Sequence, residues 1–131
     1  LGAWYHASKH ALEGWSDCLR IELSQFGIDV IVIEPGIIET EFGDVLIEPM
    51  MERSGNSAYS GMARKLQSAT AKSYEKGGGS HPSIIAETVS KALKAHRPKT
   101  RYAVGKLAKM MIASRNLLGD RLFDRMIMSQ M

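Results

Sequence analysis

The sequence has little cysteine, few aromatic residues and no long apolar run. Its one cysteine, Cys18, excludes an internal disulfide and suits a reducing compartment, so we expect a cytoplasmic protein. No apolar run approaches the roughly 20 residues that a membrane-spanning helix needs, and nothing at the start resembles a signal peptide. Aromatic residues make up 7% of the 131 residues. Because no nucleic-acid-binding module is recognisable either, we expect no nucleic-acid partner.

Charge is present in both signs but is unevenly placed. The net charge is +3, yet residues 1–48 carry two basic and nine acidic side chains, whereas residues 49–131 carry fifteen basic and five acidic ones. A basic C-terminal part is typical of a segment that contacts phosphate groups or a membrane surface. The same asymmetry also arises when two parts of a chain cover different faces of one body.

The first half of the sequence predicts a helix followed by a buried strand. Large apolar residues recur at helical spacing between His6 and Phe26, and Gly27 is a typical helix stop. In the next stretch, residues 28–36, four consecutive apolar residues are β-branched and show no alternation. This pattern indicates a strand buried on both faces of a parallel sheet, ended by Pro35-Gly36.

The second half predicts further helices and one more strand. Residues 37–60 have weak periodicity, which indicates a long loop or short helical turns. We then expect a polar helix over 61–76, an amphipathic helix over 84–96, a strand over 101–104 and one basic, apolar helix over 106–128. Two strands are too few for a stable parallel sheet with helices on both faces. The chain therefore reads as the second part of a larger α/β domain.

Tyr-x-x-x-Lys occurs twice, at residues 5–9 and 102–106. On a helix, residues four apart share one face, with Cβ atoms about 5–6 Å apart. Tyr5 and Lys9 enter the helical pattern, so their side chains can reach one spot. In the second copy the tyrosine lies in a strand and the lysine lies beyond Gly105, so four residues span roughly 13 Å. We expect chemistry only from the first copy.

A tyrosine beside a lysine suits proton transfer at an oxygen atom. A free phenol has a pKa near 10, and a neighbouring ammonium favours its ionised form. Such a pair can give or take a proton during ketone reduction or alcohol oxidation. The accompanying hydride cannot come from a side chain, so this reaction needs a cofactor.

Two stretches together carry a family resemblance. YHASKHALEGWSDCLRIEL followed by GIDVIVIEPGIIET resembles the catalytic half of the short-chain dehydrogenase/reductase family. The resemblance implies the C-terminal part of a Rossmann-type doubly wound parallel sheet, forming part of a single oxidoreductase domain over residues 1–131. Residues 1–42 then supply the catalytic helix and strand, 43–80 a variable substrate loop, and 81–131 the last helix, strand and basic tail.

The resemblance also assigns site residues, position by position. Tyr5 matches the catalytic acid/base, and Lys9 matches the lysine that tunes it and binds the nicotinamide ribose. The cofactor-binding residues implied in this way are Tyr5, Lys9, Pro35, Gly36, Ile38 and Thr40. The implied cofactor is NAD or NADP, and the implied substrate is a small carbonyl compound or secondary alcohol. The apolar loop and the eight methionines favour a lipophilic substrate.

The sequence also departs from the family pattern. The glycine-rich dinucleotide turn is missing, and the four residues before Tyr5 contain no serine to match the partner serine that lies upstream of the tyrosine in the family. The chain begins with Leu1. We therefore expect a fragment without its N-terminal dinucleotide-binding half, inactive alone. The resemblance further implies a homo-oligomer, paired through the long helix after Tyr5.

Two other interpretations remain. The 131 residues are alternatively a complete binding or interaction module, whose basic amphipathic C-terminal helix contacts a membrane or a partner. His6 and His10 are spaced four apart and suit a metal on a helix, but no third ligand is evident, so we expect no metal site.

Overall fold

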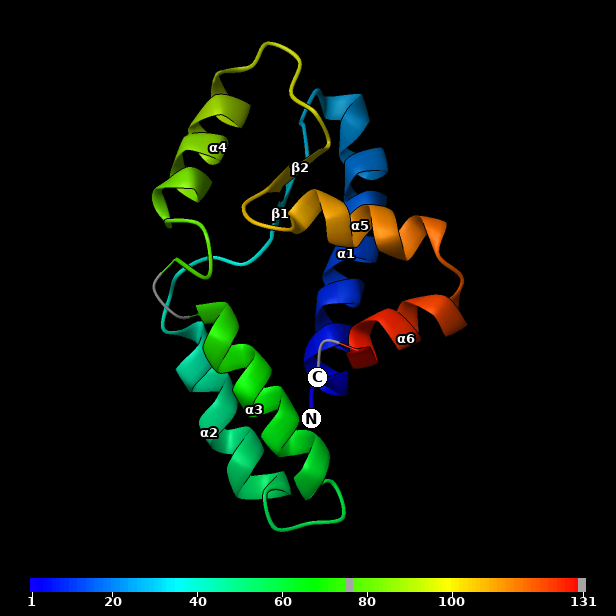
Figure 1. Ribbon diagram of the computed structural model, residues 1–131. Coiled ribbons are helices and arrows are strands. Elements are labelled where there is room, and N and C mark those ends of the chain that lie inside the picture. The colour runs from blue at the N-terminus through cyan, green and yellow to red at the C-terminus, as the bar shows by residue number, and fades with distance from the viewer. Residues whose placement is uncertain (75–76, 130–131) are drawn as a thin grey trace.

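The computed structural model describes residues 1–74 and 77–129 (Figure 1). The elements, in chain order, are α1 (Ala3–Leu23), the 3₁₀ turn η1 (Ser24–Phe26), β1 (Val32–Pro35), α2 (Phe42–Ser54), α3 (Ser60–Tyr74), α4 (Ser83–Lys94), β2 (Arg101–Val104), α5 (Ala108–Leu117) and α6 (Asp120–Ser129). The order confirms an α/β protein. No described helix is long and apolar enough to cross a membrane.

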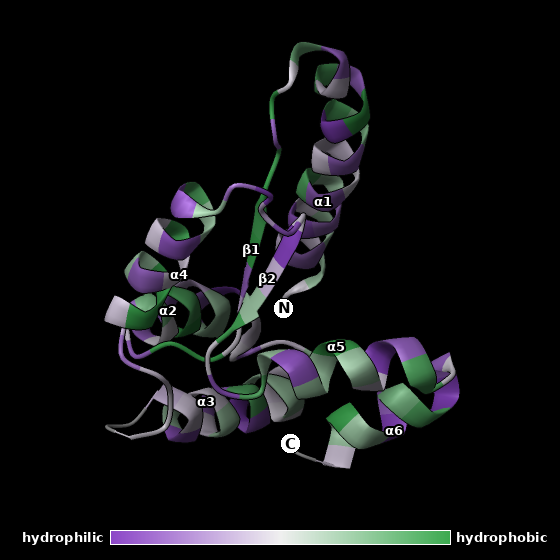
Figure 2. Ribbon diagram, turned by 90° about the horizontal axis from the view of Figure 1, so that it is seen from above, coloured by the Kyte–Doolittle hydropathy of each residue, from purple (hydrophilic) through white to green (hydrophobic). Residues whose placement is uncertain are grey.

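The two strands form a parallel sheet that lies between α1 and α4. β1 pairs with β2 in a register that sets Val32 opposite Arg101 and Pro35 opposite Val104. Figures 1 and 2 both show α4 on one side of the strands and α1 on the other. Parallel strands need a long crossover between them, and residues 36–100 provide it. The carboxyl ends of both strands therefore point the same way, toward the segment that follows Pro35.

The predicted first helix and second strand are confirmed, and the first strand is shorter than predicted. α1 runs to Leu23, and η1 extends it to Gly27, whose φ of 68° gives the left-handed stop that glycine favours. β1 begins only at Val32, not at Ile28, because β2 supplies a partner only from Arg101 onward. Val32, Ile33 and Glu34 are half-buried, so the strand is not buried on both faces as predicted.

The prediction of a long loop or short helical turns over residues 37–60 was wrong for its middle part, which is one helix of 13 residues. Residues 42–54 form helix α2, with Pro49 inside it, and α2 packs side by side with α3 in a hairpin (Figure 1). The apolar periodicity of α2 is weak, so packing against α3 stabilises it more than its own pattern does. The polar helix expected over 61–76 is α3; the end of that prediction, residues 75–76, lies outside the described residues.

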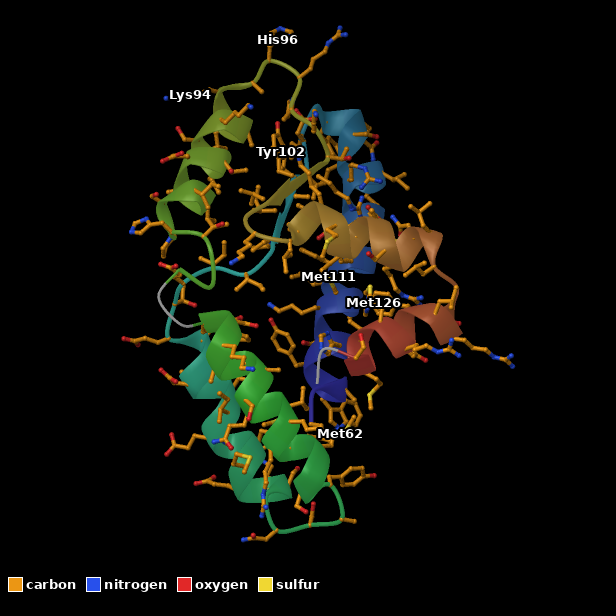
Figure 3. The ribbon with its side chains drawn as sticks, in the orientation of Figure 1. Met62, Lys94, His96, Tyr102, Met111 and Met126 are labelled. Carbon is orange, nitrogen blue, oxygen red and sulfur yellow. The ribbon has the colours of Figure 1, made fainter. Side chains whose placement is uncertain are left out.

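The single C-terminal helix expected over 106–128 is two helices. α5 ends at Leu117, and Leu118 has extended backbone dihedrals (φ −89°, ψ 133°). The carbonyl of Gly119 then accepts hydrogen bonds from Leu122 and Phe123 N–H, which starts α6. Glycine is about 1 kcal/mol less favourable than alanine inside a helix, so the helix breaks beside Gly119, where helix propensity is lowest. Figure 3 shows Met111 of α5 and Met126 of α6 near each other, on the inside of the resulting corner.

The described residues have a small core. The buried apolar residues are alanines, one each on α3, α4 and α5: Ala63, Ala92 and Ala108. Large apolar side chains on α1 are exposed instead, with Trp4 at 90% and Trp15 at 60% of full exposure. The sheet that the described residues form has two strands. The long helix α1 thus presents a broad apolar face that no described element covers.

Candidate active site

The first two turns of α1 place Tyr5 and Lys9 together. Because they are four residues apart on one helix, their side chains leave the same face, and Lys9 Nζ lies 5.4 Å from the centre of the Tyr5 ring. The Tyr5 side chain is part-exposed at 40%, so its hydroxyl group is accessible to a ligand. The structure therefore provides a proton-transfer group with a cation beside it.

A cavity of about 690 Å³ opens in front of this pair. Its walls come from α1, from β1 and the segment after it, and from single residues of α2, α3 and α4. All six residues that the sequence analysis assigned to catalysis or cofactor binding line this cavity: Tyr5, Lys9, Pro35, Gly36, Ile38 and Thr40. Residues from two stretches about 30 positions apart thus meet at one place, at the carboxyl end of β1, where ligands bind in open α/β sheets.

Gly36 is required by a close approach of two backbones. Its N–H donates to Val104 O at 2.8 Å, which extends the pairing of β1 with β2. A Cβ atom at this position would lie 2.1 Å from Lys106 O and 2.8 Å from Ala108 N. Only glycine therefore lets the cavity wall pass this closely over the segment that follows β2.

Ile38 lines the cavity, and its backbone groups are not used by the neighbouring bridge. The neighbouring groups are used: Ser80 N–H donates to Ile37 O, and Glu39 N–H donates to Ser80 O, both at 2.9 Å. In this parallel bridge the N–H and C=O of Ile38 point away from Ser80. Within residues 1–74 and 77–129, neither group has a hydrogen-bond partner. Ile38 thus offers one donor and one acceptor to a ligand.

Thr40 is the last of the six assigned residues, and it also lines the cavity. Its Oγ1 accepts a hydrogen bond from Phe42 N–H at 3.4 Å, at the start of α2. The bond is long, so the hydroxyl group retains capacity for a ligand.

An aromatic row on one wall was missed by the sequence analysis. The ring of Phe42 lies 5.6 Å from the ring of Tyr5 and 6.2 Å from that of Tyr74, centre to centre. Phe42 and Tyr74 both line the cavity. Burial raises the pKa of the Tyr74 phenol, and the nearby Tyr5 raises it further, so Tyr74 stays neutral. No signal in the sequence connects Tyr74 with Tyr5, because only the fold of α2 against α3 brings them together.

Two carboxylates at the other end of the cavity were also missed. Glu13 of α1 and Glu34 of β1 line it and share the guanidinium of Arg101, with N–O distances of 3.0 and 3.3 Å. Burial raises the pKa of Glu34, and the charge of Glu13 adds to this, while Arg101 opposes it. This end of the cavity is acidic.

The second Tyr-x-x-x-Lys copy does not form a pair. The hydroxyl group of Tyr102 accepts from Lys99 N–H at 3.1 Å, whereas Lys106 Nζ donates to Gly77 O at 3.2 Å. Neither residue lines the cavity that holds Tyr5. Figure 3 shows Tyr102 at the sheet, toward His96. Within the described part of the chain, no three histidine, cysteine, aspartate or glutamate side chains gather as metal ligands.

Comparison with known protein sequences identifies the family of this chain. The short chain dehydrogenase family model matches residues 1–50, which hold the first Tyr-x-x-x-Lys and the Pro-Gly strand end. The uncharacterised oxidoreductase YusZ of Bacillus subtilis is 37% identical over 115 residues, which are 86% of this chain and 40% of the relative. The chain belongs to the short-chain dehydrogenase family. No solved structure matches it.

Other relatives in the family have named activities. The NADPH-dependent 3-dehydrocapnine reductase of Ornithobacterium rhinotracheale is 34% identical and matches 92% of this chain. The 17-beta-hydroxysteroid dehydrogenase type 6 of Mus musculus is 27% identical and matches 96% of it. In both cases the match covers 42% of the relative. This short-chain dehydrogenase sequence thus spans about two fifths of the length of the curated relatives it matches.

Proposed function

We propose that this chain carries the catalytic residues of an NAD(P)-dependent oxidoreductase that interconverts a carbonyl compound and a secondary alcohol. The observation that supports it best is the single cavity shared by Tyr5, Lys9 and the unpartnered backbone groups of Ile38. A proton-transfer group, a cation and a donor–acceptor pair in one cleft fit a carbonyl substrate next to a nicotinamide.

Tyr5 is the acid/base in this proposal. In reduction its hydroxyl group donates a proton to the carbonyl oxygen, and in oxidation the phenolate accepts the proton of the alcohol. Lys9, with its ammonium 5.4 Å from the Tyr5 ring centre, adds a positive charge near this phenol. The part-exposed position of Tyr5 at the cavity lets a substrate reach its hydroxyl group.

The residues around the cavity fit the nicotinamide end of the cofactor. When bound, the nicotinamide supplies or accepts the hydride of the reaction. Lys9 would hold the ribose, the N–H and C=O of Ile38 would hold the carboxamide, and Thr40 would add its hydroxyl group. The backbone groups of Ile38, which have no partner among the described residues, are the strongest support, because a carboxamide offers both a donor and an acceptor. One relative is named as NADPH-dependent, and we propose NAD or NADP here.

We further propose that the chain corresponds to the C-terminal part of a Rossmann-type domain. Three observations support this: the match covers about 40% of the relatives' length, the sheet has only two strands, and α1 exposes Trp4 and Trp15. The glycine-rich turn and the partner serine would then lie upstream of Tyr5. We expect no hydride transfer from residues 1–131 alone.

The test uses the full-length protein that contains this chain, with NADH or NADPH and a panel of ketones. Tyr5→Phe removes the proton donor while it keeps the ring, so turnover should fall by about 10²–10⁴-fold. Tyr102→Phe is the matched control, because it makes the same change in the second Tyr-x-x-x-Lys copy and should leave turnover within a few-fold. Near-normal turnover in Tyr5→Phe would exclude Tyr5 as the acid/base. The absence of any ketone-dependent turnover in the unaltered protein would overturn the proposed function.

A further inference from the structure

A row of aromatic rings extends from Tyr5 along the wall of the cavity. Phe42 contacts Tyr5 with its ring at 5.6 Å, and Tyr74 follows at 6.2 Å beyond it. Both additional rings line the cavity, and both come from the α2–α3 hairpin rather than from α1. A substrate whose carbonyl oxygen reaches the Tyr5 hydroxyl group can therefore place the rest of its body along these aromatic rings.

The base of the hairpin holds this wall in place. Glu39, just before α2, accepts a hydrogen bond from Gly77 N–H at 2.7 Å, and the Ile37–Ser80–Glu39 bridge joins the same two ends. Both ends of the hairpin thus meet beside Ile38, which itself lines the cavity. Within the hairpin, a Cβ atom at Gly43 would lie 3.0 Å from the Tyr74 ring, so the small residue after Phe42 lets Tyr74 lie against α2.

The charges around the cavity disfavour an anionic ligand. Among the described residues, those with a formal charge that line it are Lys9, Glu13 and Glu34. Lys9 is assigned to the cofactor ribose, and the two glutamates are already paired with Arg101. No further lining cation among the described residues is left to bind a carboxylate or phosphate on the substrate. Several other lining residues are apolar, among them Leu12 and Ile85. A neutral, apolar body next to the carbonyl group matches these surroundings.

We propose that Phe42 and Tyr74 determine substrate specificity, and that they select neutral carbonyl compounds with an apolar body of several carbons over small or carboxylate-bearing ones. This inference rests on the proposed oxidoreductase function. Neither residue takes part in proton transfer; each contributes apolar contact that a small substrate cannot use. Burial of each methylene group against such a wall raises the specificity constant by roughly fourfold.

Three ketones test the proposal in the full-length protein. Acetone is the small probe, 2-decanone carries an apolar chain, and 4-oxopentanoate carries a carboxylate. We expect kcat/KM to be highest for 2-decanone and lowest for 4-oxopentanoate. Phe42→Ala and Tyr74→Ala should each lower the ratio of kcat/KM for 2-decanone to that for acetone by about 10- to 100-fold, the range for apolar discrimination in a pocket.

The ratio is insensitive to folding defects. Loss of properly folded protein lowers the rate with both ketones equally, so it cancels, and Phe42→Leu and Tyr74→Leu provide milder versions of the same change. Tyr59→Ala is the matched control. Tyr59 lies between α2 and α3, is 62% exposed and does not line the cavity, so its loss should leave the ratio unchanged. Tyr74→Phe keeps the ring and should also preserve the ratio.

The outcomes separate this inference from the proposed function. If the unaltered protein reduces ketones and Tyr5→Phe abolishes the reaction, but the alanine variants leave the ratio unchanged, the specificity role is wrong and the catalytic assignment stands. A preference of the unaltered protein for 4-oxopentanoate over 2-decanone would also overturn the inference. If no ketone is reduced, the proposed function fails and this inference fails with it.

Discussion

Nη2 of Arg101, on β2, lies 3.0 Å from both carboxylate oxygens of Asp17, on α1. The same nitrogen donates to Glu13 at 3.0 Å, and Nε of the guanidinium lies 3.3 Å from Glu34 on β1. One side chain therefore joins the helix that carries Tyr5 and Lys9 to both strands of the sheet. Arg101 is thus a positioning residue for the proposed site, although it does not line the cavity.

Replacing Arg101 by methionine should destabilise the full-length protein. The change keeps an unbranched side chain but leaves three carboxylates, from Glu13, Asp17 and Glu34, close together without their shared cation. We expect a loss of about 1–2 kcal/mol in the free energy of unfolding, between the values for exposed and buried ion pairs, because the network is about one third exposed.

Urea unfolding of the full-length protein measures this loss. Arg115→Met is the control, since Arg115 forms an exposed pair with Asp120 across the α5–α6 corner and should cost less. An Arg101→Met variant as stable as the Arg115→Met variant would show that the network does not hold α1 to the sheet.

The Arg101 network shows where sequence reasoning reached its limit. Helix α1 and strands β1 and β2 were predictable because periodicity, β-branched runs and Pro-Gly or Gly stops are local signals. Helix α2 was not, because its weak pattern and Pro49 argue against a helix, and only packing on α3 overrides them. Two partners of Arg101, Asp17 and Glu13, lie 84 and 88 residues away in the sequence, and no local pattern links them.

The candidate site divides in the same way. The spacing of Tyr5 and Lys9 and the family resemblance assigned six residues to catalysis or cofactor binding, and all six line one cavity. Phe42 and Tyr74 escaped because their role depends on the hairpin between them. Phe42 follows Thr40 closely in the sequence, but no local pattern connects either ring with Tyr5.

Stability should fall in acid partly through Asp17. Its hydrogen bonds with Arg101, and then with Arg20, lower its pKa from 3.8 to about 2. A lowered folded-state pKa means that the contribution is complete above the unfolded pKa and is lost as the pH falls through the folded one. The contribution should therefore be present above about pH 4 and gone below about pH 2.

Thermal unfolding of the full-length protein between pH 2 and pH 8 tests this sign. Asp17→Asn removes the titrating group, so the difference in Tm between the unaltered protein and the variant should shrink as the pH falls from 4 to 2. Glu34→Gln is the opposite case. Burial raises the pKa of Glu34, so the ionised form of Glu34 destabilises the folded protein. The Glu34→Gln variant should therefore show its largest increase in Tm at pH values above this raised pKa. A Tm difference for Asp17→Asn that is constant across the range would contradict the prediction.

Gly36 should tolerate no side chain. In Gly36→Ala the new Cβ meets the carbonyl oxygen of Lys106 at 2.1 Å, and backbone atoms cannot move aside as a flexible side chain can. Overpacking of this kind lowers the free energy of unfolding by about 1–3 kcal/mol.

Gly14→Ala in α1 is the matched control, because nothing lies within 4 Å of its new Cβ. That variant should instead gain about 0.5–1 kcal/mol from higher helix propensity. Equal stability of the two variants in urea would rule out the close approach at Gly36.

The two lysines of the Tyr-x-x-x-Lys copies should differ in their effect on cofactor binding. Lys9 lines the cavity beside Tyr5, whereas Lys106 donates to Gly77 O outside it. A hydrogen bond from a charged group contributes about 1.5–3 kcal/mol, so Lys9→Met should raise the Kd for NADH or NADPH by about 10- to 100-fold. Lys106→Met makes the same change in the second copy and should leave the Kd within about threefold, since the bond it loses is an exposed one.

Fluorescence titration of the reduced cofactor into full-length protein measures binding without turnover. If both substitutions weaken binding equally, or neither does, Lys9 does not hold the ribose, and the cavity in front of Tyr5 is not where the nicotinamide binds.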